Sequence, residues 1–64
     1  MKVYIEIHNS KCGIDKYNFN GVKLISYNPV IETLHLSNFE SELKCYSHHD
    51  FSIDSIIKFY VEEI

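Results

Sequence analysis

The sequence predicts an α+β domain, in which an antiparallel β-sheet of about four to five strands carries one C-terminal amphipathic α-helix packed on a sheet face. Two observations carry this prediction. The first half alternates apolar and polar residues with the period of two that is typical of strands. Residues 52–64 instead repeat apolar side chains at helical spacing. With 64 residues, the chain is expected to form a single domain (1–64) with a small core.

The first expected strand covers residues 2–9, where three aliphatic residues alternate with polar neighbours. A hairpin is expected next, because Asn20-Gly21 tolerates the positive φ angles of a type I′ turn and separates residues 15–19 from 22–27. A two-residue loop would place Phe19 opposite Val22. The sequence therefore predicts that these two strands pair with each other.

Two further strands are expected in the second half. Pro29 closes the hairpin because it cannot donate to a central ladder. Residues 30–36 then alternate in the manner of a strand, and residues 43–47 form a weaker candidate.

The helix expected over residues 52–64 is the largest apolar element. Ser52 precedes it as an N-cap, and Asp54, Lys58 and Glu62 would line its solvated face. Its buried stripe is expected to consist of Ile53, Ile56, Ile57, Tyr60, Val61 and Ile64.

Charge is unevenly distributed along the chain. Residues 1–29 hold four lysines and two acids, whereas residues 30–64 hold seven acids and two lysines, and the chain has no arginine. Proteins that read nucleic acids rely on arginine forks and a basic face, so direct nucleic-acid binding is disfavoured. An acidic half instead favours a protein partner with a basic groove.

No motif indicates an enzyme, a cofactor or a metal. Two glycines cannot supply a phosphate-binding loop, and no Gly-x-Ser-x-Gly elbow is present. A structural zinc site needs four ligands, so the Cys45-x-x-His48-His49 run would require Cys12 and one of the histidines to converge, and we interpret the run as a polar loop before the helix. Whether Cys12 and Cys45 ever pair stays open. Reduced thiols, with no signal peptide and no long apolar run, favour the cytoplasm.

One stretch resembles a known family. The chain reads Leu34-x-Leu36-Ser37-Asn38-Phe39-Glu40 and later Asp54-Ser55-Ile56-Ile57-Lys58. These segments resemble the short, dimeric, phage-encoded inhibitors of uracil-DNA glycosylase, in which a strand leads to a Phe-Glu pair and a helix follows. The resemblance spans residues 34–64. It departs from the family where Leu43 replaces a second pocket aromatic and where about five extra residues precede the helix.

The resemblance implies a DNA mimic. Such an inhibitor places carboxylates where the glycosylase of the bacterial host expects phosphates, and an apolar pocket holds the enzyme's intercalating side chain. Glu40 would be the key acid and Phe39 the pocket aromatic, with Tyr46 as the nearest substitute for the second aromatic. The partner-binding residues implied are Phe39, Glu40, Ser41, Glu42, Leu43 and Tyr46.

One further expectation and two alternative functions complete the sequence analysis. The small core and the surplus apolar residues predict a homodimer. A different phage counter-defence protein, plugging a nuclease or a CRISPR effector, would share the size and the acidic half. A small single-strand nucleic-acid module is the remaining alternative, because nine aromatic residues on a sheet could stack bases.

Overall fold

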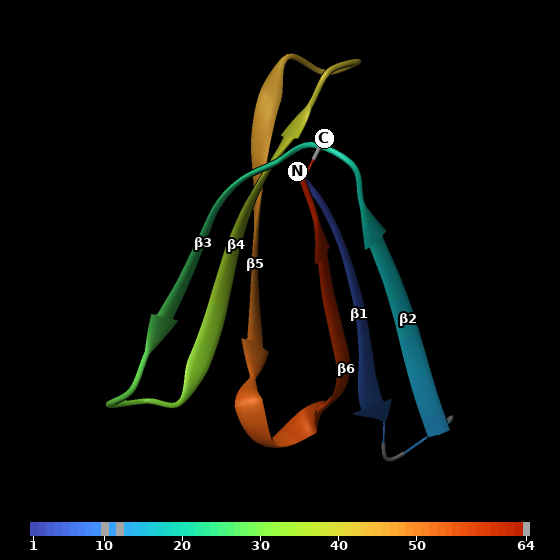
Figure 1. Cartoon of the computed structure of the whole chain (residues 1–64), viewed down its shortest axis with the longest axis vertical. Coiled ribbons are helices and arrows are strands. Elements are labelled where there is room, and N and C mark those ends of the chain that lie inside the picture. The colour runs from blue at the N-terminus through green and yellow to red at the C-terminus, as the bar shows by residue number, and fades with distance from the viewer. Residues whose placement is uncertain (10, 12, 64) are drawn as a thin grey trace.

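The computed structural model describes residues 1–9, 11 and 13–63, and over this part of the chain the protein is all-β (Figure 1). Six strands form two three-stranded antiparallel sheets. The elements are β1 (Lys2–Asn9), β2 (Gly13–Phe19), β3 (Val22–Asn28), β4 (Thr33–Glu40), β5 (Cys45–Ser52), the 3₁₀ turn η1 (Ile53–Ser55) and β6 (Ile56–Glu62). No helix of the described residues is long and apolar enough to cross a membrane.

Sheet A has the strand order β2-β1-β6, and sheet B has the order β3-β4-β5. In sheet A, Ile5 on the central strand lies opposite Tyr17 on one side and Phe59 on the other. In sheet B, Leu36 on the central strand lies opposite Ile25 and His49. Residues directly opposite one another share a face of the sheet. We call the face of each sheet that carries the buried residue Ile5 or Leu36 the inner face, and the opposite one the outer face.

The predicted C-terminal helix is wrong, and with it the α+β class. Residues 52–64 contain η1 and the strand β6, and Ser52 makes no side-chain cap. Five of the seven residues of β6 are β-branched or aromatic, which favours an extended backbone once a partner strand is present. β1 supplies that partner, with Lys2 opposite Glu62 and Tyr4 opposite Tyr60. Ile64, which completed the expected stripe, lies outside the described residues.

The predicted hairpin at Asn20-Gly21 is also wrong. β2 and β3 belong to different sheets, and the chain passes from one sheet to the other between them (Figure 1). Gly21 lacks the positive φ of a type I′ turn. It is required for close backbone approach instead: a Cβ atom at Gly21 would lie 2.6 Å from the carbonyl oxygen of Phe39. The Phe39 N–H donates to the Gly21 carbonyl at 2.8 Å, which fixes this bend against β4.

The two strands expected in the second half exist but are displaced toward the C-terminus. The predicted strand 30–36 runs from Thr33 to Glu40, and the predicted strand 43–47 runs from Cys45 to Ser52. Residues 29–32 form a turn in which the Val30 N–H donates to Asn28 Oδ1 at 3.0 Å and Glu32 has a φ of 51°. Such side-chain caps and left-handed residues end strands, and alternation alone does not reveal them.

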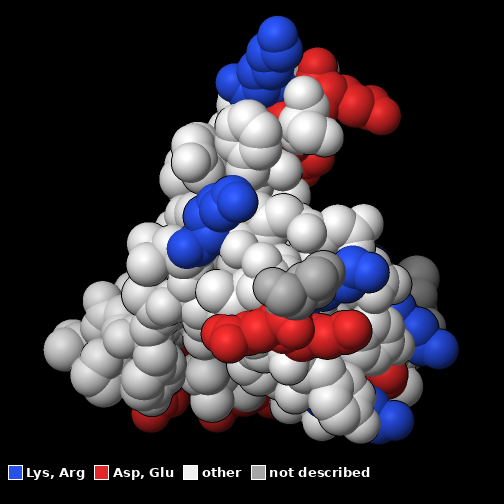
Figure 2. All heavy atoms as spheres, turned by 45° about the horizontal axis from the view of Figure 1, so that its top comes forward, with Lys and Arg blue, Asp and Glu red and all other residues white. Residues whose placement is uncertain are grey.

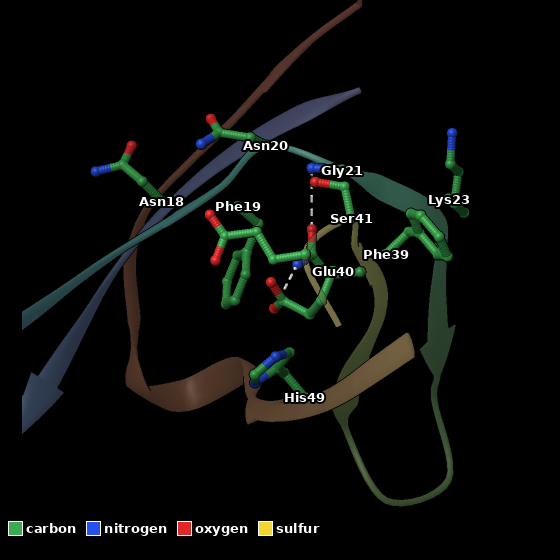
Figure 3. A pocket seen from close by; sticks show the side chains of 11 residues that line it. Asn18, Phe19, Asn20, Gly21, Lys23, Phe39, Glu40, Ser41 and His49 are labelled. Atoms are coloured by element: carbon green, nitrogen blue, oxygen red, sulfur yellow. Dashed lines mark hydrogen bonds between the residues drawn. The ribbon is translucent and has the colours of Figure 1, made fainter. Parts of the chain in front are cut away.

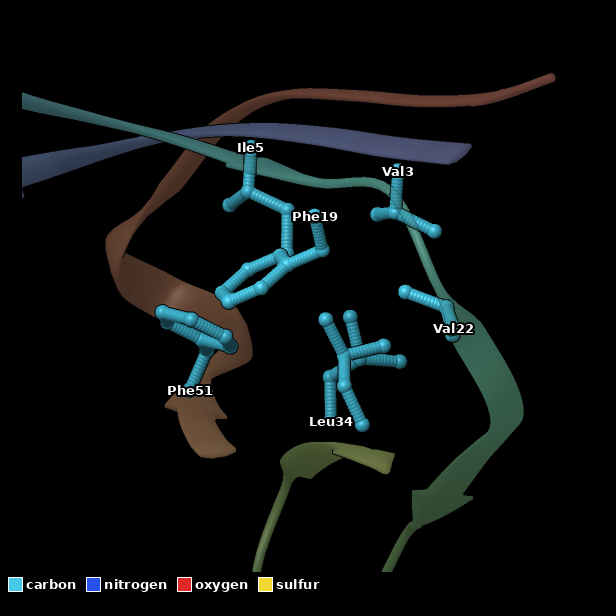
Figure 4. Packing of buried hydrophobic residues seen from close by; sticks show 7 residues of the cluster. Val3, Ile5, Phe19, Val22, Leu34 and Phe51 are labelled. Atoms are coloured by element: carbon cyan, nitrogen blue, oxygen red, sulfur yellow. The ribbon is translucent and has the colours of Figure 1, made fainter. Parts of the chain in front are cut away.

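The core lies between the two sheets (Figure 4). Ile5 of β1 and Leu36 of β4 are fully buried, so each sheet contributes one central strand to the centre. The complete set of buried apolar residues is Val3, Ile5, Phe19, Val22, Leu34, Leu36 and Phe51. Ile56, expected on the helix stripe, packs at the edge of this core.

Candidate functional site

The site suggested by the sequence lies where β4 ends and turns into β5. Glu40 is the last residue of β4, opposite Cys45, and residues 41–44 form the turn. Lys44 has a φ of 54°, so the turn closes through a left-handed residue. This end of the hairpin projects beyond sheet A at the top of Figure 1.

The Glu40 carboxylate is held by neighbouring side chains. Its Oε1 atom accepts hydrogen bonds from Asn38 Nδ2 at 3.0 Å and from Ser47 Oγ at 3.1 Å. Ser47 Oγ lies 3.0 Å from His49 Nε2. Because Asn38, Ser47 and His49 lie on the inner face of sheet B, Glu40 is fixed by the alternation of β4 and β5.

Asn38 connects this carboxylate to the bend between the sheets. It is buried, and its Oδ1 atom accepts the Gly21 N–H at 3.0 Å while its Nδ2 donates to Glu40. A buried amide whose oxygen and nitrogen both have partners pins its surroundings. The bend at Gly21 and the end of β4 therefore form one rigid unit.

A cavity of about 600 Å³ opens beside this unit (Figure 3). Four residues implied by the resemblance line it, namely Phe39, Glu40, Ser41 and Glu42. Its other lining residues are Asn18, Phe19, Asn20, Gly21, Lys23, Asn38 and His49. The lining combines two carboxylates, one lysine, three asparagines and two phenylalanines, so it suits a polar or charged group with an apolar edge better than a purely apolar ligand.

The remaining two residues lie outside this lining. Tyr46 is opposite Phe39 across β4 and β5, and the two rings meet edge to face with centroids 5.3 Å apart. Leu43 is 75% exposed at the tip of the turn. The aromatic pair and Leu43 thus form an apolar rim beside the cavity.

A hydrogen-bonded cluster on the outer face of sheet B was not anticipated from the sequence. Asp50 Oδ1 lies 2.7 Å from His35 Nδ1, and His35 Nε2 lies 3.3 Å from Ser37 Oγ. His48 Nδ1 is 3.1 Å from the same hydroxyl, and the two imidazoles stack with centroids 5.5 Å apart. Knowing that β4 pairs with β5, with Ser37 opposite His48 and His35 opposite Asp50, would have found it.

This cluster is best assigned a structural role. The order of atoms, carboxylate to Nδ1 and Nε2 to hydroxyl, resembles that of a nucleophilic relay. Ser37 is only 7% exposed, however, so its hydroxyl is shielded from a substrate. The cluster orders the outer face of sheet B next to the Phe39–Tyr46 pair.

Among the described residues of sheet A, acidic side chains alternate with basic ones on the outer face. On the outer face of sheet A, Glu6 lies between Lys16 and Lys58, and Lys2 lies opposite Glu62. The view in Figure 2 likewise shows acidic and basic side chains interspersed. The strongest local acidic feature near the cavity is therefore the pair Glu40 and Glu42.

The chain matches no family model, no curated protein and no solved structure.

Proposed function

We propose that the protein is a protein-binding inhibitor that uses the end of its β4–β5 hairpin to occupy the basic groove of a DNA-processing enzyme. Uracil-DNA glycosylase is the enzyme to test first. The observation that carries the proposal is the Glu40 carboxylate, fixed by Asn38 and Ser47 at a cavity with Phe39 beside it.

A fixed carboxylate suits this role on physical grounds. A side chain that is already ordered loses less rotamer entropy on binding, so more of its interaction energy appears as affinity. Glu42 extends the negative charge along the turn, and such charge steers association with a basic groove. The apolar rim formed by Phe39, Tyr46 and Leu43 would supply contact area that salt does not screen.

The proposal now depends on a shorter stretch than the sequence suggested. Residues 54–58, which resembled a helix of the inhibitor family, lie in η1 and β6. The support that remains is the segment from Leu34 to Glu40, which forms the strand and carries the site. If glycosylase is not the target, the same surface would serve a nuclease or a CRISPR effector with a basic groove.

The test is inhibition of uracil excision from uracil-containing DNA by the purified protein. Glu40→Gln keeps the shape and the hydrogen-bonding oxygen but removes the charge, and we expect it to weaken binding by about 2 kcal/mol or more. Glu32→Gln, at an exposed turn position at the other end of β4, is the matched control, and its effect should stay below about 1 kcal/mol. Equal inhibition by the parent and by folded Glu40→Gln would refute the role of this carboxylate.

Phe39→Ala tests the apolar part of the same surface. Removing a central aromatic anchor typically costs about 2 kcal/mol or more in binding. The loss should persist at high salt, whereas the Glu40 contribution should shrink as salt screens it. Circular dichroism and thermal melts of each variant separate loss of binding from loss of folding.

A single-strand nucleic-acid module is the second candidate, and one observation favours it. Tyr4 and Tyr60 lie side by side on the outer face of sheet A, with ring centroids 6.2 Å apart and with lysines on the same face. Glu6 and Glu62 alternate with those lysines and reduce the attraction for phosphates. Binding of a fluorescent single-stranded oligonucleotide that is lost in Tyr60→Ala would support this candidate over the inhibitor.

A further inference from the structure

β6 is an edge strand with apolar and aromatic side chains on both of its faces. It ends sheet A, and its residues from Ile57 to Glu62 are all exposed. Phe59 and Val61 lie on the inner face, opposite Ile5 and Val3, yet are 39% and 43% exposed, while Tyr60 on the outer face is 60% exposed. An exposed edge of this kind is a template for pairing with another strand.

The other three edge strands carry features that oppose pairing. β2 places the charge of Asp15 on the inner face, opposite Ile7. β3 has a register shift between Val22 and Leu24 and is followed by Pro29. β5 is polar along most of its length. Inward charges, bulges, prolines and polar edges all discourage strand addition. β6 also has a register shift, at its start opposite Glu6 and Ile7, but its regularly paired residues 58–62 contain no proline and no inward charge, so this part of β6 differs from the other edges.

We propose that two copies of the chain pair antiparallel through β6 about a two-fold axis at Tyr60, joining the two copies of sheet A into one six-stranded sheet. This inference does not depend on the proposed function. In this register Tyr60 faces its own copy, Phe59 faces Val61 of the second copy, and Lys58 faces Glu62 of the second copy. The two-fold axis generates each of the last two pairs twice.

The sequence of β6 is therefore complementary to itself in this register. Shifting the axis to Phe59 would place Ile56 opposite Glu62, and shifting it to Val61 would place Tyr60 opposite Glu62. Either change would lose both Lys–Glu pairs. A slip by one residue would set inward residues opposite outward ones. Opposite charges and aromatic pairs directly across strands stabilise a sheet, which selects the Tyr60 register.

The rows of side chains within each sheet continue across the proposed interface. On the outer face, Lys16, Glu6 and Lys58 of one copy would be followed by Glu62 and Lys2 of the second, so that the sign alternates across five positions. On the inner face, the apolar row through Ile5 and Phe59 would be followed by Val61 and Val3 of the second copy. Both faces thus remain consistent through the junction.

The chain as a whole exposes more area than is typical of its mass. The chain exposes 4771 Å², whereas a compact monomer of 7.6 kDa would expose about 4300 Å². A chain this small gains stability from association because its own core is limited. A second copy is the occupant that the charges of β6 favour, because Lys58 and Glu62 of one copy match Glu62 and Lys58 of the other.

The experiment measures mass by sedimentation equilibrium over roughly 5–500 µM, with folding checked by circular dichroism. The parent should approach twice 7.6 kDa at high concentration. Lys58→Glu would set two acids opposite each other, and Glu62→Lys would set two lysines opposite each other. We expect each to raise the dimer dissociation constant about tenfold or more. In an equimolar mixture, one copy carries acids at positions 58 and 62 and the other carries lysines at both. Each cross-strand pair then joins opposite charges again, so the mixture should form a heterodimer.

Lys16→Glu is the matched control. It also places a second acid opposite Glu6 within the chain, but it does so on β2, at the far edge of sheet A. Its dimer dissociation constant should stay within about twofold of the parent. A parent that remains 7.6 kDa throughout, a mixture that fails to associate, or a control that dissociates as readily as Lys58→Glu would each overturn the proposal.

Discussion

The two sheets are built in different ways although each has three antiparallel strands. Sheet B is a meander, in which β3, β4 and β5 follow one another both in the chain and in space. Sheet A takes β1 and β2 from the start of the chain and β6 from its end, so that Lys2 lies opposite Glu62. Sheet A therefore needs a contact across nearly the whole chain before it is complete.

This difference teaches where local sequence decides structure. In sheet B, each strand meets its neighbour across a four-residue turn, so alternation and turn residues largely determine it. In sheet A, β6 is extended only because β1 already offers an edge. Both central strands meet in one core, through Ile5 and Leu36, so the two sheets are expected to unfold together.

The largest effect is expected from substitutions in this shared core. Ile5→Ala and Leu36→Ala each empty a fully buried position on a central strand, and each should lower the free energy of unfolding by about 2–4 kcal/mol. Val30→Ala, at a position that is 88% exposed, should change it by less than about 0.5 kcal/mol. Urea denaturation measures all three.

Amide hydrogen exchange on the same variants sharpens the comparison. If the sheets form one cooperative unit, Leu36→Ala should lower protection in β1 as much as in β4. Protection lost in sheet B alone would show that sheet A folds independently, and the idea of one shared core would then be wrong.

A moderate effect is expected at the bend that joins the sheets. Gly21→Ala would bring a Cβ atom within 2.6 Å of a backbone oxygen that cannot move without disturbing β4. We expect a loss of about 1–3 kcal/mol in the free energy of unfolding. Asn20→Ala, the exposed neighbour, should cost less than about 0.5 kcal/mol. Equal costs for the two variants would mean that the close approach to Phe39 does not constrain the bend.

The sequence predicted individual strands better than their pairing. β1 was predicted with its observed bounds, and β2 and β3 with ends that differ by one or two residues. Asn20-Gly21 is a strong hairpin signal locally, but the closeness of Gly21 to Phe39 decides its geometry, and that contact is non-local. The helix prediction for residues 52–64 was wrong for the same reason. The apolar residues of β6 satisfy a helical spacing and a strand alternation at once, and pairing with β1 selects the strand.

The candidate site was predictable only in part. Phe39, Glu40, Ser41 and Glu42 are adjacent in sequence, so their gathering at one cavity follows from the end of a strand. Asn38 and Ser47, which hold Glu40, could be found only from the pairing of β4 with β5. Lys23 and Phe19 reach the cavity because the chain bends between the sheets, which the expected hairpin excluded.

The smallest expected effect concerns the outer face of sheet A. The Tyr4 hydroxyl donates to Glu6 Oε2 at 2.6 Å. This hydrogen bond, together with partial desolvation and the negative charge of Glu6, raises the pKa of Tyr4 above its ordinary value of about 10. Because the folded pKa is the higher one, the stabilising contribution of Tyr4 is present below about pH 10 and is lost as the pH rises through that folded pKa.

An NMR titration of the Tyr4 ring carbons measures this directly. The Tyr4 signal should change above about pH 10, and Glu6→Gln should bring its midpoint back toward the ordinary value, because the variant removes the charge that opposes ionisation. Tyr4→Phe identifies the signal and should remove this part of the alkaline destabilisation. Because the two sheets are expected to unfold together, the alkaline loss of stability should appear in both of them, although this pair lies on sheet A. A Tyr4 midpoint that Glu6→Gln leaves unchanged would show that the negative charge of Glu6 does not hold the phenol in its neutral form.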